Sequence, residues 1–250
     1  MSDGDKPSHP WYPFRMRWPV TIDEAKREQG SIRENVRIEP LRKPPRFVAG
    51  VDVAFSGSRM VGVASVFHYP EMTPTEDALA VAKIPFPYIP GYLSFREGPA
   101  IIGAMEKLGM KPDVVLVDGQ GIAHPRGAGI ASHIGVLLNL PTVGCAKSRL
   151  IGGYEEPGVK KGQWSPLKLD DGIVGVVMRT RDGVKPLFVS PGHLITLRES
   201  IEIVLTCCTN YRIPEPLRRA DRLSKERRRV LSRDREEKSP LKFFIDLNLP

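Results

Sequence analysis

The chain has 250 residues, of which 41% are hydrophobic, and this is enough apolar material for the core of one large domain. The composition excludes an intrinsically disordered protein. There are 37 Lys and Arg residues against 29 Asp and Glu, and the net charge of +8 is compatible with a polyanionic partner such as nucleic acid.

The sequence predicts neither a membrane protein nor a secreted one. No stretch approaches the roughly 18 uncharged apolar residues that span a bilayer, and the opening MSDGDKPSHP lacks the apolar core of a signal peptide. The three cysteines have neither disulfide nor zinc-site spacing, and Cys145 is expected to be a buried small side chain. We therefore expect a soluble, cytoplasmic protein that is a monomer by default.

The N-terminal part of the chain divides into an arm and a helix. Residues 1–20 combine prolines with aromatic residues, which disfavours a helix and predicts an extended arm lying on the main domain. Residues 21–37 are acidic first and basic later, as expected of a surface helix. We assign the main domain to residues 21–234 and a C-terminal tail to residues 235–250.

Three apolar runs follow, at residues 47–55, 60–67 and 78–86, and their short connections predict an antiparallel meander. Asp52 lies inside the first run, where an unpaired carboxylate is costly to bury. A Lys or Arg partner is one explanation for this acid, and a bound metal ion is the other.

The segment PFPYIPGYLSFRE, at residues 85–97, is interpreted as a rigid loop that runs into a helix. Ser94 and Glu97 have the spacing of a capping box, which gives Glu97 an ordinary structural role. The same residue would project from the first turn of the helix, near the edge of the predicted sheet.

The stretch at residues 113–149 contains the strongest candidate site. An apolar run at residues 114–117 ends at Asp118 and opens into a glycine-rich loop, as expected of a buried strand, although an Asp-Gly pair is also ordinary turn chemistry. A helix and a second short strand follow, and that strand ends at Lys147. Ligands usually bind beyond the carboxyl ends of such strands, so we expect one crevice to be lined by Asp118, His124, Arg126 and Lys147.

The remaining chain is read as a loop, two strands and two helices. Residues 152–171 are polar and rich in glycine and predict a loop, and residues 173–180 and 186–189 predict strands. Thr196 and Glu199 form a second capping box before an apolar helical stripe. The last helix follows Pro214.

Four acids then have a reason to converge, namely Asp52, Glu97, Asp118 and Asp221, the last of these on the final helix. Hydrolysis of a phosphodiester requires hard oxygen ligands for a divalent cation such as Mg²⁺ or Mn²⁺. Lys147 could stabilise charge at the phosphate, and His124 could contact the phosphate or move a proton.

From about residue 47 to residue 223 the sequence resembles the endonuclease V family. The motifs that carry the resemblance are VAGVDVAF, PYIPGYLSFREGP, VVLVDGQGIAHPRGAGIASHIGV, PTVGCAKSRL, VSPGH and RIPEPLRRAD, in this order. The resemblance implies an α/β fold of the ribonuclease H-like type, with a mixed five-stranded sheet flanked by helices. It also implies Mg²⁺-dependent cleavage of DNA containing deoxyinosine, and of inosine-containing RNA, at the second phosphodiester 3′ to the lesion.

Carried over by motif, Asp52, Glu97 and Asp118 resemble the metal ligands of the family. Asp221 matches a fourth active-site position, and Lys147 and His124 match supporting residues. Tyr88 resembles a wedge that fills the gap left by a flipped base. The base would enter a pocket formed by the remaining matched residues, which are Gly91, Leu93, Gly119, Gly121, Ile130 and Gly144.

Two other functions compete with this interpretation. One is another ribonuclease H-like nuclease, acting on RNA hybrids or junctions. Such an enzyme would share the acids, but the PYIP loop argues against it. A nucleic-acid-binding module without catalysis would use the basic surface alone. In the tail, Phe243 and Phe244 could also dock on a repair partner such as a sliding clamp, although packing on the main domain is the simpler expectation.

Overall fold

The computed structural model describes residues 18–237 and the side chains of residues 18–233. The predicted arm up to residue 17, and the predicted tail from residue 238 with Phe243 and Phe244, lie outside the described residues. Within residues 18–237, no helix is both long and apolar enough to cross a membrane.

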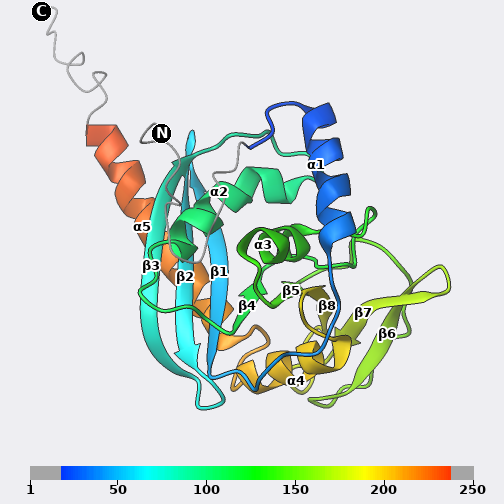
Figure 1. Cartoon of the computed structure of the whole chain (residues 1–250). Helices are drawn as coiled ribbons and strands as arrows, with labels where there is room; N and C mark the ends of the chain where they lie inside the picture. The colour runs from blue at the N-terminus through cyan, green and yellow to red at the C-terminus, as the bar shows by residue number, and fades with distance from the viewer. Residues whose placement is uncertain (1–17, 238–250) are drawn as a thin grey trace, which may run out of the picture.

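The centre of the molecule is one sheet of eight strands in the order β3-β2-β1-β4-β5-β8-β7-β6 (Figure 1). The strands are β1 (Phe47–Ser56), β2 (Arg59–His68), β3 (Thr73–Lys83), β4 (Val114–Val117), β5 (Thr142–Ala146), β6 (Trp164–Leu169), β7 (Gly172–Met178) and β8 (Leu187–His193). The helices are α1 (Ile22–Asn35), α2 (Leu93–Met105), α3 (Ile130–Leu138), α4 (Leu197–Cys207) and α5 (Glu215–Glu237).

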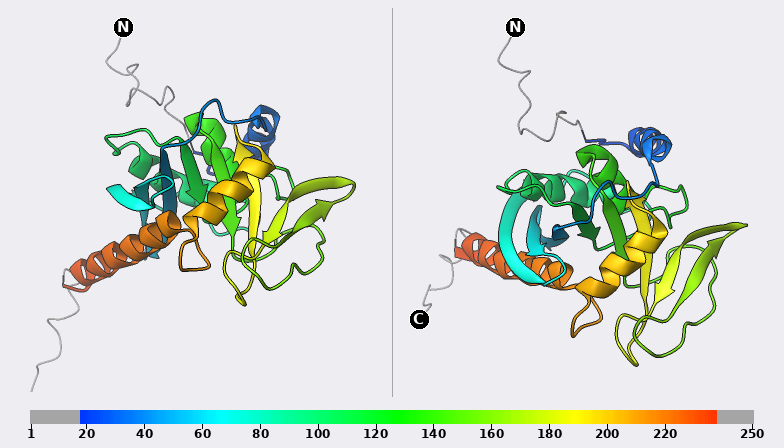
Figure 2. Two further views of the ribbon diagram at one scale, coloured as in Figure 1. Left: turned by 90° about the horizontal axis from the view of Figure 1, so that it is seen from below. Right: turned by 60° about the horizontal axis from the view of Figure 1, so that its bottom comes forward.

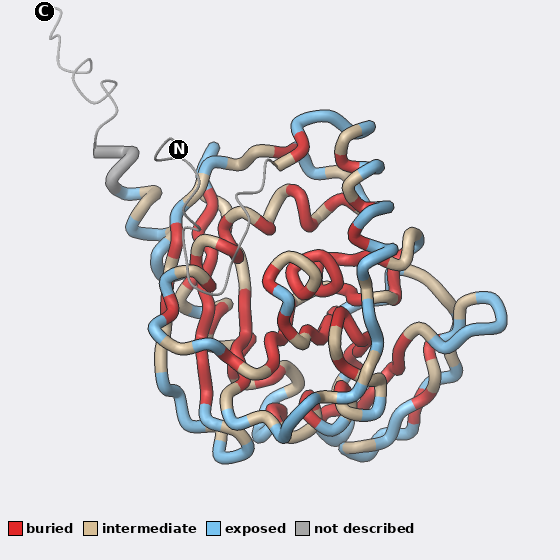
Figure 3. The backbone as a smooth tube through the Cα atoms, viewed as in Figure 1, coloured by how far each residue is buried: buried red, intermediate tan, exposed pale blue. Residues whose placement is uncertain are grey.

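The mixed five-stranded sheet expected from the sequence is confirmed, and three further strands extend it. β1, β2 and β3 form the antiparallel meander, and β1, β4 and β5 pair in parallel. β8, β7 and β6 then add to the β5 edge in antiparallel pairs. Figure 3 shows that the strands at the centre are largely buried and that the outer loops are exposed.

Helices cover both faces of this sheet. On one face, α2 and α3 pack over β1 and β4 through residues such as Ile101, Ile134 and Val51. On the other face, α4 and the start of α5 pack over β4, β5 and β8. The views in Figure 2 show the far end of α5 extending away from the sheet.

Two glycines allow helices to approach the sheet closely from opposite sides. A Cβ atom on Gly50 would lie 2.3 Å from the carbonyl carbon of Pro216, at the start of α5. A Cβ atom on Gly62 would lie 2.1 Å from the carbonyl oxygen of Ala100, in α2. Since only glycine lacks that atom, both helices can pack against the strand backbone itself.

Two local predictions differ from the structure. The predicted loop at residues 152–171 contains the edge strand β6, in which Ser165 and Leu167 are buried and their neighbours are not. Because Pro166 and Lys168 interrupt the apolar run, this alternation is hard to recognise in the sequence. The capping box at Thr196 and Glu199 is confirmed. The N-cap residue of α2 is Tyr92, and its side chain forms no capping hydrogen bond, so the box predicted at Ser94 and Glu97 is wrong.

Candidate active site

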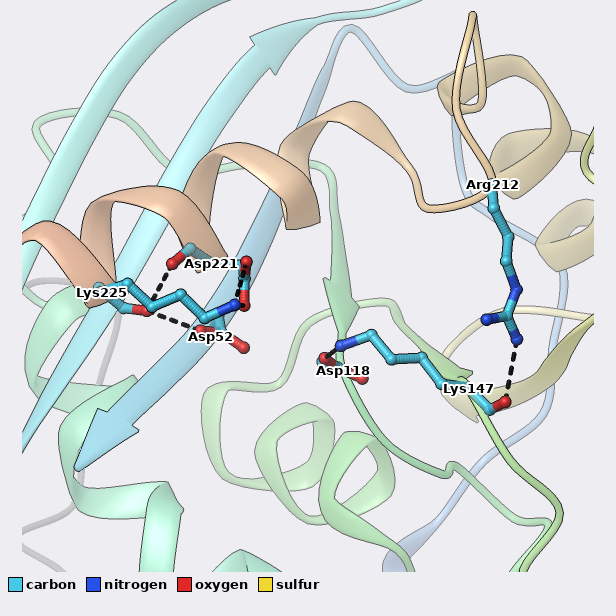
Figure 4. Close-up of polar contacts among 7 residues, drawn as sticks. Asp52, Asp118, Lys147, Arg212, Asp221 and Lys225 are labelled. Carbon is cyan, nitrogen blue, oxygen red and sulfur yellow. Dashed lines mark hydrogen bonds and ion pairs between the residues drawn. The ribbon is translucent and has the colours of Figure 1, made fainter.

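Asp52 and Asp118 are brought together by two neighbouring parallel strands. β1 and β4 pair with Val51 opposite Val117, so the next residue of each chain lies at the same level of the sheet. Asp52 continues along β1, whereas Asp118 is the first residue after β4. Figure 4 shows Asp52 partway along β1 and Asp118 at the end of β4. The parallel pairing therefore brings the two predicted acids to neighbouring strands.

The helix α5 closes one side of this pair of acids. The hydroxyl of Ser224 donates a hydrogen bond of 2.8 Å to Oδ2 of Asp52. Asp221, three residues before Ser224 on the same helix, forms an ion pair of 2.6 Å with Lys225 (Figure 4). Among the described side chains, neither Lys nor Arg forms an ion pair with Asp52, so the hydrogen bond from Ser224 is not accompanied by an ion pair there.

Glu97 enters the site from α2, one turn after the helix begins. Burial, together with the negative charges of Asp52 and Asp118, raises the pKa of its carboxyl to about 8. Burial also raises the pKa of Asp52 to about 6, against the opposing effect of the Ser224 hydrogen bond. The three predicted ligands thus form one electrostatic cluster in which each negative charge disfavours the next.

A divalent cation fits the chemistry of this cluster. Within residues 18–237, no group of three His, Cys, Asp or Glu side chains is arranged so that it could already hold a metal ion. The donors are nevertheless hard carboxylate oxygens, and burial raises the pKa of both Asp52 and Glu97 although the charge of Lys147 opposes the rise. A cation would add positive charge beside these acids.

Lys147 and Arg212 form the opposite side of the crevice. Nζ of Lys147, at the end of β5, forms an ion pair with Asp118 (Figure 4). Arg212 donates hydrogen bonds to the carbonyl oxygens of Lys147, at 2.9 Å, and Pro186, at 2.7 Å. Arg212 belongs to the RIPEP motif but was not recognised as part of the site, because nothing local in the sequence indicates which carbonyls it contacts.

Both ring nitrogens of His124 are held by backbone groups. Its Nδ1 accepts a hydrogen bond from the backbone N–H of Arg126, at 3.2 Å, so its Nε2 carries the proton and donates to the carbonyl oxygen of Gly91, at 3.1 Å. Burial, together with the charge of Arg126, lowers the pKa of His124 to about 4, against the opposing effect of the hydrogen bond to Gly91. The ring is therefore neutral and holds the Gly91 loop.

Beside the acids lies a pocket of about 250 Å³. Four of the six predicted pocket residues line it, which are Gly91, Leu93, Gly119 and Ile130, and so does Tyr88, the predicted wedge. Gly121 and Gly144 do not line it and instead pack against each other behind it, since a Cβ atom on Gly144 would lie 2.3 Å from the backbone nitrogen of Gly121. Tyr88 is 69% exposed at the pocket, and the lining also includes Gln29, Gln120, His124 and Arg149.

A mixed sheet whose central strands end in carboxylates, with helices on both faces, is the arrangement of a ribonuclease H-like nuclease. The family model described as Endonuclease V matches residues 30–222. The chain therefore belongs to the endonuclease V family and is an enzyme that hydrolyses phosphodiester bonds.

Individual relatives agree with this assignment. The endonuclease V of Trichormus variabilis is 49% identical over 213 residues, which cover 84% of this chain and 96% of the relative. The crystal structure of the Streptomyces avermitilis endonuclease V has a TM-score of 0.82 at 40% identity and covers 86% of this chain and 96% of that one. The Ciona intestinalis enzyme, in complex with a 24mer DNA containing an inosine followed by a ribo-adenosine, has a TM-score of 0.71 at 29% identity and covers 84% and 98%.

Proposed function

We propose that this enzyme is a divalent-metal-dependent endonuclease that repairs deaminated adenine in DNA. It recognises deoxyinosine by turning the base out of the helix, and it cleaves the second phosphodiester bond on the 3′ side, leaving a 3′-hydroxyl and a 5′-phosphate. Inosine in RNA is a further substrate. The observation that carries the proposal is that Asp118, on the strand next to that of Asp52, directly precedes Gly119 in the lining of the pocket. The inosine-containing DNA bound to the Ciona intestinalis enzyme supports the same substrate here.

Asp52, Asp118 and Glu97 would hold the cation, which is Mg²⁺ or in its place Mn²⁺. When bound, the cation polarises a water molecule and offsets negative charge on the scissile phosphate. Lys147, whose ammonium group now pairs with Asp118, is placed to donate to a phosphate oxygen at the same edge. Asp221 lies on the other side of Asp52, where its carboxylate can accept a proton or orient a water molecule.

The pocket would receive the flipped base. The lining includes Gly91 and Gly119, and at such glycines backbone groups can read the Watson–Crick edge of hypoxanthine. The exposed ring of Tyr88 would stack into the gap left in the helix. Flipping a base out of the helix costs a few kcal/mol, and less when the base is weakly paired. An inosine–thymine pair is therefore easier to open than a normal base pair, which favours recognition of the lesion.

The experiment that tests this proposal is cleavage of matched end-labelled strands, one with a single deoxyinosine in DNA and one with a single inosine in RNA. Each is incubated with Mg²⁺ or with EDTA, using wild type, Asp118→Ala and, as a matched control, the exposed acid variant Asp182→Ala. We expect a metal-dependent nick one nucleotide beyond the lesion with wild type and Asp182→Ala only. Tight binding without any cleavage would contradict the proposal and favour a binding module.

A further inference from the structure

Gln29 lies on the inner face of α1, just before the residues matched by the family model, and it lines the pocket. Its side chain is 1% exposed. A polar side chain so deeply buried must have all of its hydrogen-bonding groups satisfied, and its partners show what it does.

The amide of Gln29 joins the two walls of the pocket. Nε2 donates to the carbonyl oxygen of Gly91, at 3.1 Å, on the wall that carries Tyr88. It also donates to the carbonyl oxygen of Ala128, at 2.8 Å, next to the Gly129 and Ile130 wall. These two carbonyls belong to loops that are far apart in the sequence, so one side chain from α1 sets the distance between them.

Arg126 completes this connection. Its Nε donates to Oε1 of Gln29, and its terminal nitrogen donates to the carbonyl oxygen of Gly91, at 2.7 Å. The guanidinium lies 4.2 Å from the ring centre of Tyr92. With the bond from His124, the Gly91 carbonyl accepts from three side chains, and its loop is held at a residue whose φ of +81° suits glycine.

We propose that Gln29 is a positioning residue for substrate recognition: it fixes the width of the base pocket without touching the acids. This inference rests on the proposed function, since it assumes that the pocket receives a base. Both amide groups of Gln29 are already engaged by Gly91, Ala128 and Arg126, so the residue acts through the two loops rather than by reading the base itself. Its loss should therefore affect binding and selectivity, and leave the chemical step at Asp52 and Asp118 in place.

The test compares Gln29→Ala with Gln29→Glu and with Ile32→Ala. Glu retains an acceptor for Arg126 but cannot donate to Gly91 or Ala128. Ile32 is 3% exposed on the same helix and does not line the pocket, so its truncation loosens α1 without removing the connection. For a duplex with one deoxyinosine, we expect both Gln29 variants to raise KM about tenfold, the size expected for two lost hydrogen bonds, with kcat within about twofold of wild type.

The same variants should discriminate less well between deoxyinosine and deoxyadenosine at the same position, because a wider pocket accepts other purines. Ile32→Ala should retain the wild-type KM and selectivity even though its free energy of unfolding falls. An unchanged KM in Gln29→Ala, or an equal rise in Ile32→Ala, would overturn the inference. So would a loss confined to kcat.

Amide hydrogen exchange gives a readout that does not depend on any substrate. We expect faster exchange at residues 88–93 and 127–131 in Gln29→Ala than in Ile32→Ala. If the wild-type enzyme does not cleave substrates that contain inosine, the proposed function is refuted. The exchange rates would still decide whether Gln29 holds the two loops. Equal exchange in the two variants would refute the role of Gln29.

Discussion

The hydroxyl of Ser224 donates to the carboxylate of Asp52 at 2.8 Å, which connects the last helix to the first strand inside the active site. A second serine of α5, Ser232, hydrogen-bonds Ser56 at the end of the same strand, at 2.9 Å, far from the acids. The two bonds join the same pair of elements, but only one of them orients a candidate metal ligand.

We predict that Ser224→Ala lowers cleavage about tenfold, because the Asp52 carboxylate loses the group that orients it. Ser232→Ala should cost a similar amount of stability, about 1 kcal/mol, with unchanged cleavage. Rates under saturating Mg²⁺ and urea unfolding of both variants provide the comparison. Equal effects on cleavage would mean that the bond to Asp52 is merely structural.

Tyr88→Ala should weaken binding of an inosine duplex by about 1 to 3 kcal/mol, the value of one base stacked on an aromatic ring. Binding of the metal should be unaffected, since Tyr88 lies at the pocket and not among the acids. Fluorescence anisotropy with labelled duplex measures the first quantity and calorimetry with Mn²⁺ the second. Trp164, 49% exposed on β6, offers the control variant Trp164→Ala, and unchanged affinity in Tyr88→Ala would exclude the wedge role.

Buried His133 makes the free energy of unfolding depend on pH. Burial lowers its pKa to about 3, and among the described residues neither ring nitrogen has a hydrogen-bond partner. Its ring lies between Trp18 and Phe95, with centroids 5.7 Å and 4.9 Å away. The unfolded chain therefore takes up a proton near pH 6.5, whereas the folded protein does so only near pH 3.

We accordingly expect His133→Phe to be as stable as wild type or more stable at neutral pH. Its advantage should grow as the pH falls from about 6.5 towards about 3, by at most about 1.4 kcal/mol per pH unit. Urea unfolding of both proteins over this range measures the difference. A difference that is independent of pH would show that the folded protein already accepts the proton on His133.

Gly144→Ala should destabilise the protein by about 1 to 3 kcal/mol, because the new methyl group would meet the backbone of Gly121 and neither strand nor loop can move freely. The matched control is Gly30→Ala on α1, where an added Cβ atom meets nothing within 4 Å and alanine favours the helix. Thermal unfolding measures the stability of both variants. A Gly144→Ala variant as stable as wild type would show that the packing behind the pocket is loose.

Much of the architecture follows from local patterns in the sequence. The apolar run at residues 114–117, the acid that follows it, and the capping boxes at Thr21 and Thr196 are recognisable because periodicity and capping act over a few neighbouring residues. The three N-terminal strands are recognisable for the same reason, although β3 begins at Thr73, earlier than the apolar run. The motifs also place Asp52 and Asp118 at the same sheet edge once parallel pairing is assumed.

The contacts that complete the site depend on packing between distant segments. Ser224 and Asp52 are 172 positions apart, and Gln29 and Ala128 are 99 apart. No local pattern indicates such pairs, because the helix faces and loops that meet are chosen by the burial of apolar surface over the whole domain. For the same reason His124, a plausible phosphate ligand in the sequence, becomes in the folded protein a neutral ring that holds the Gly91 loop.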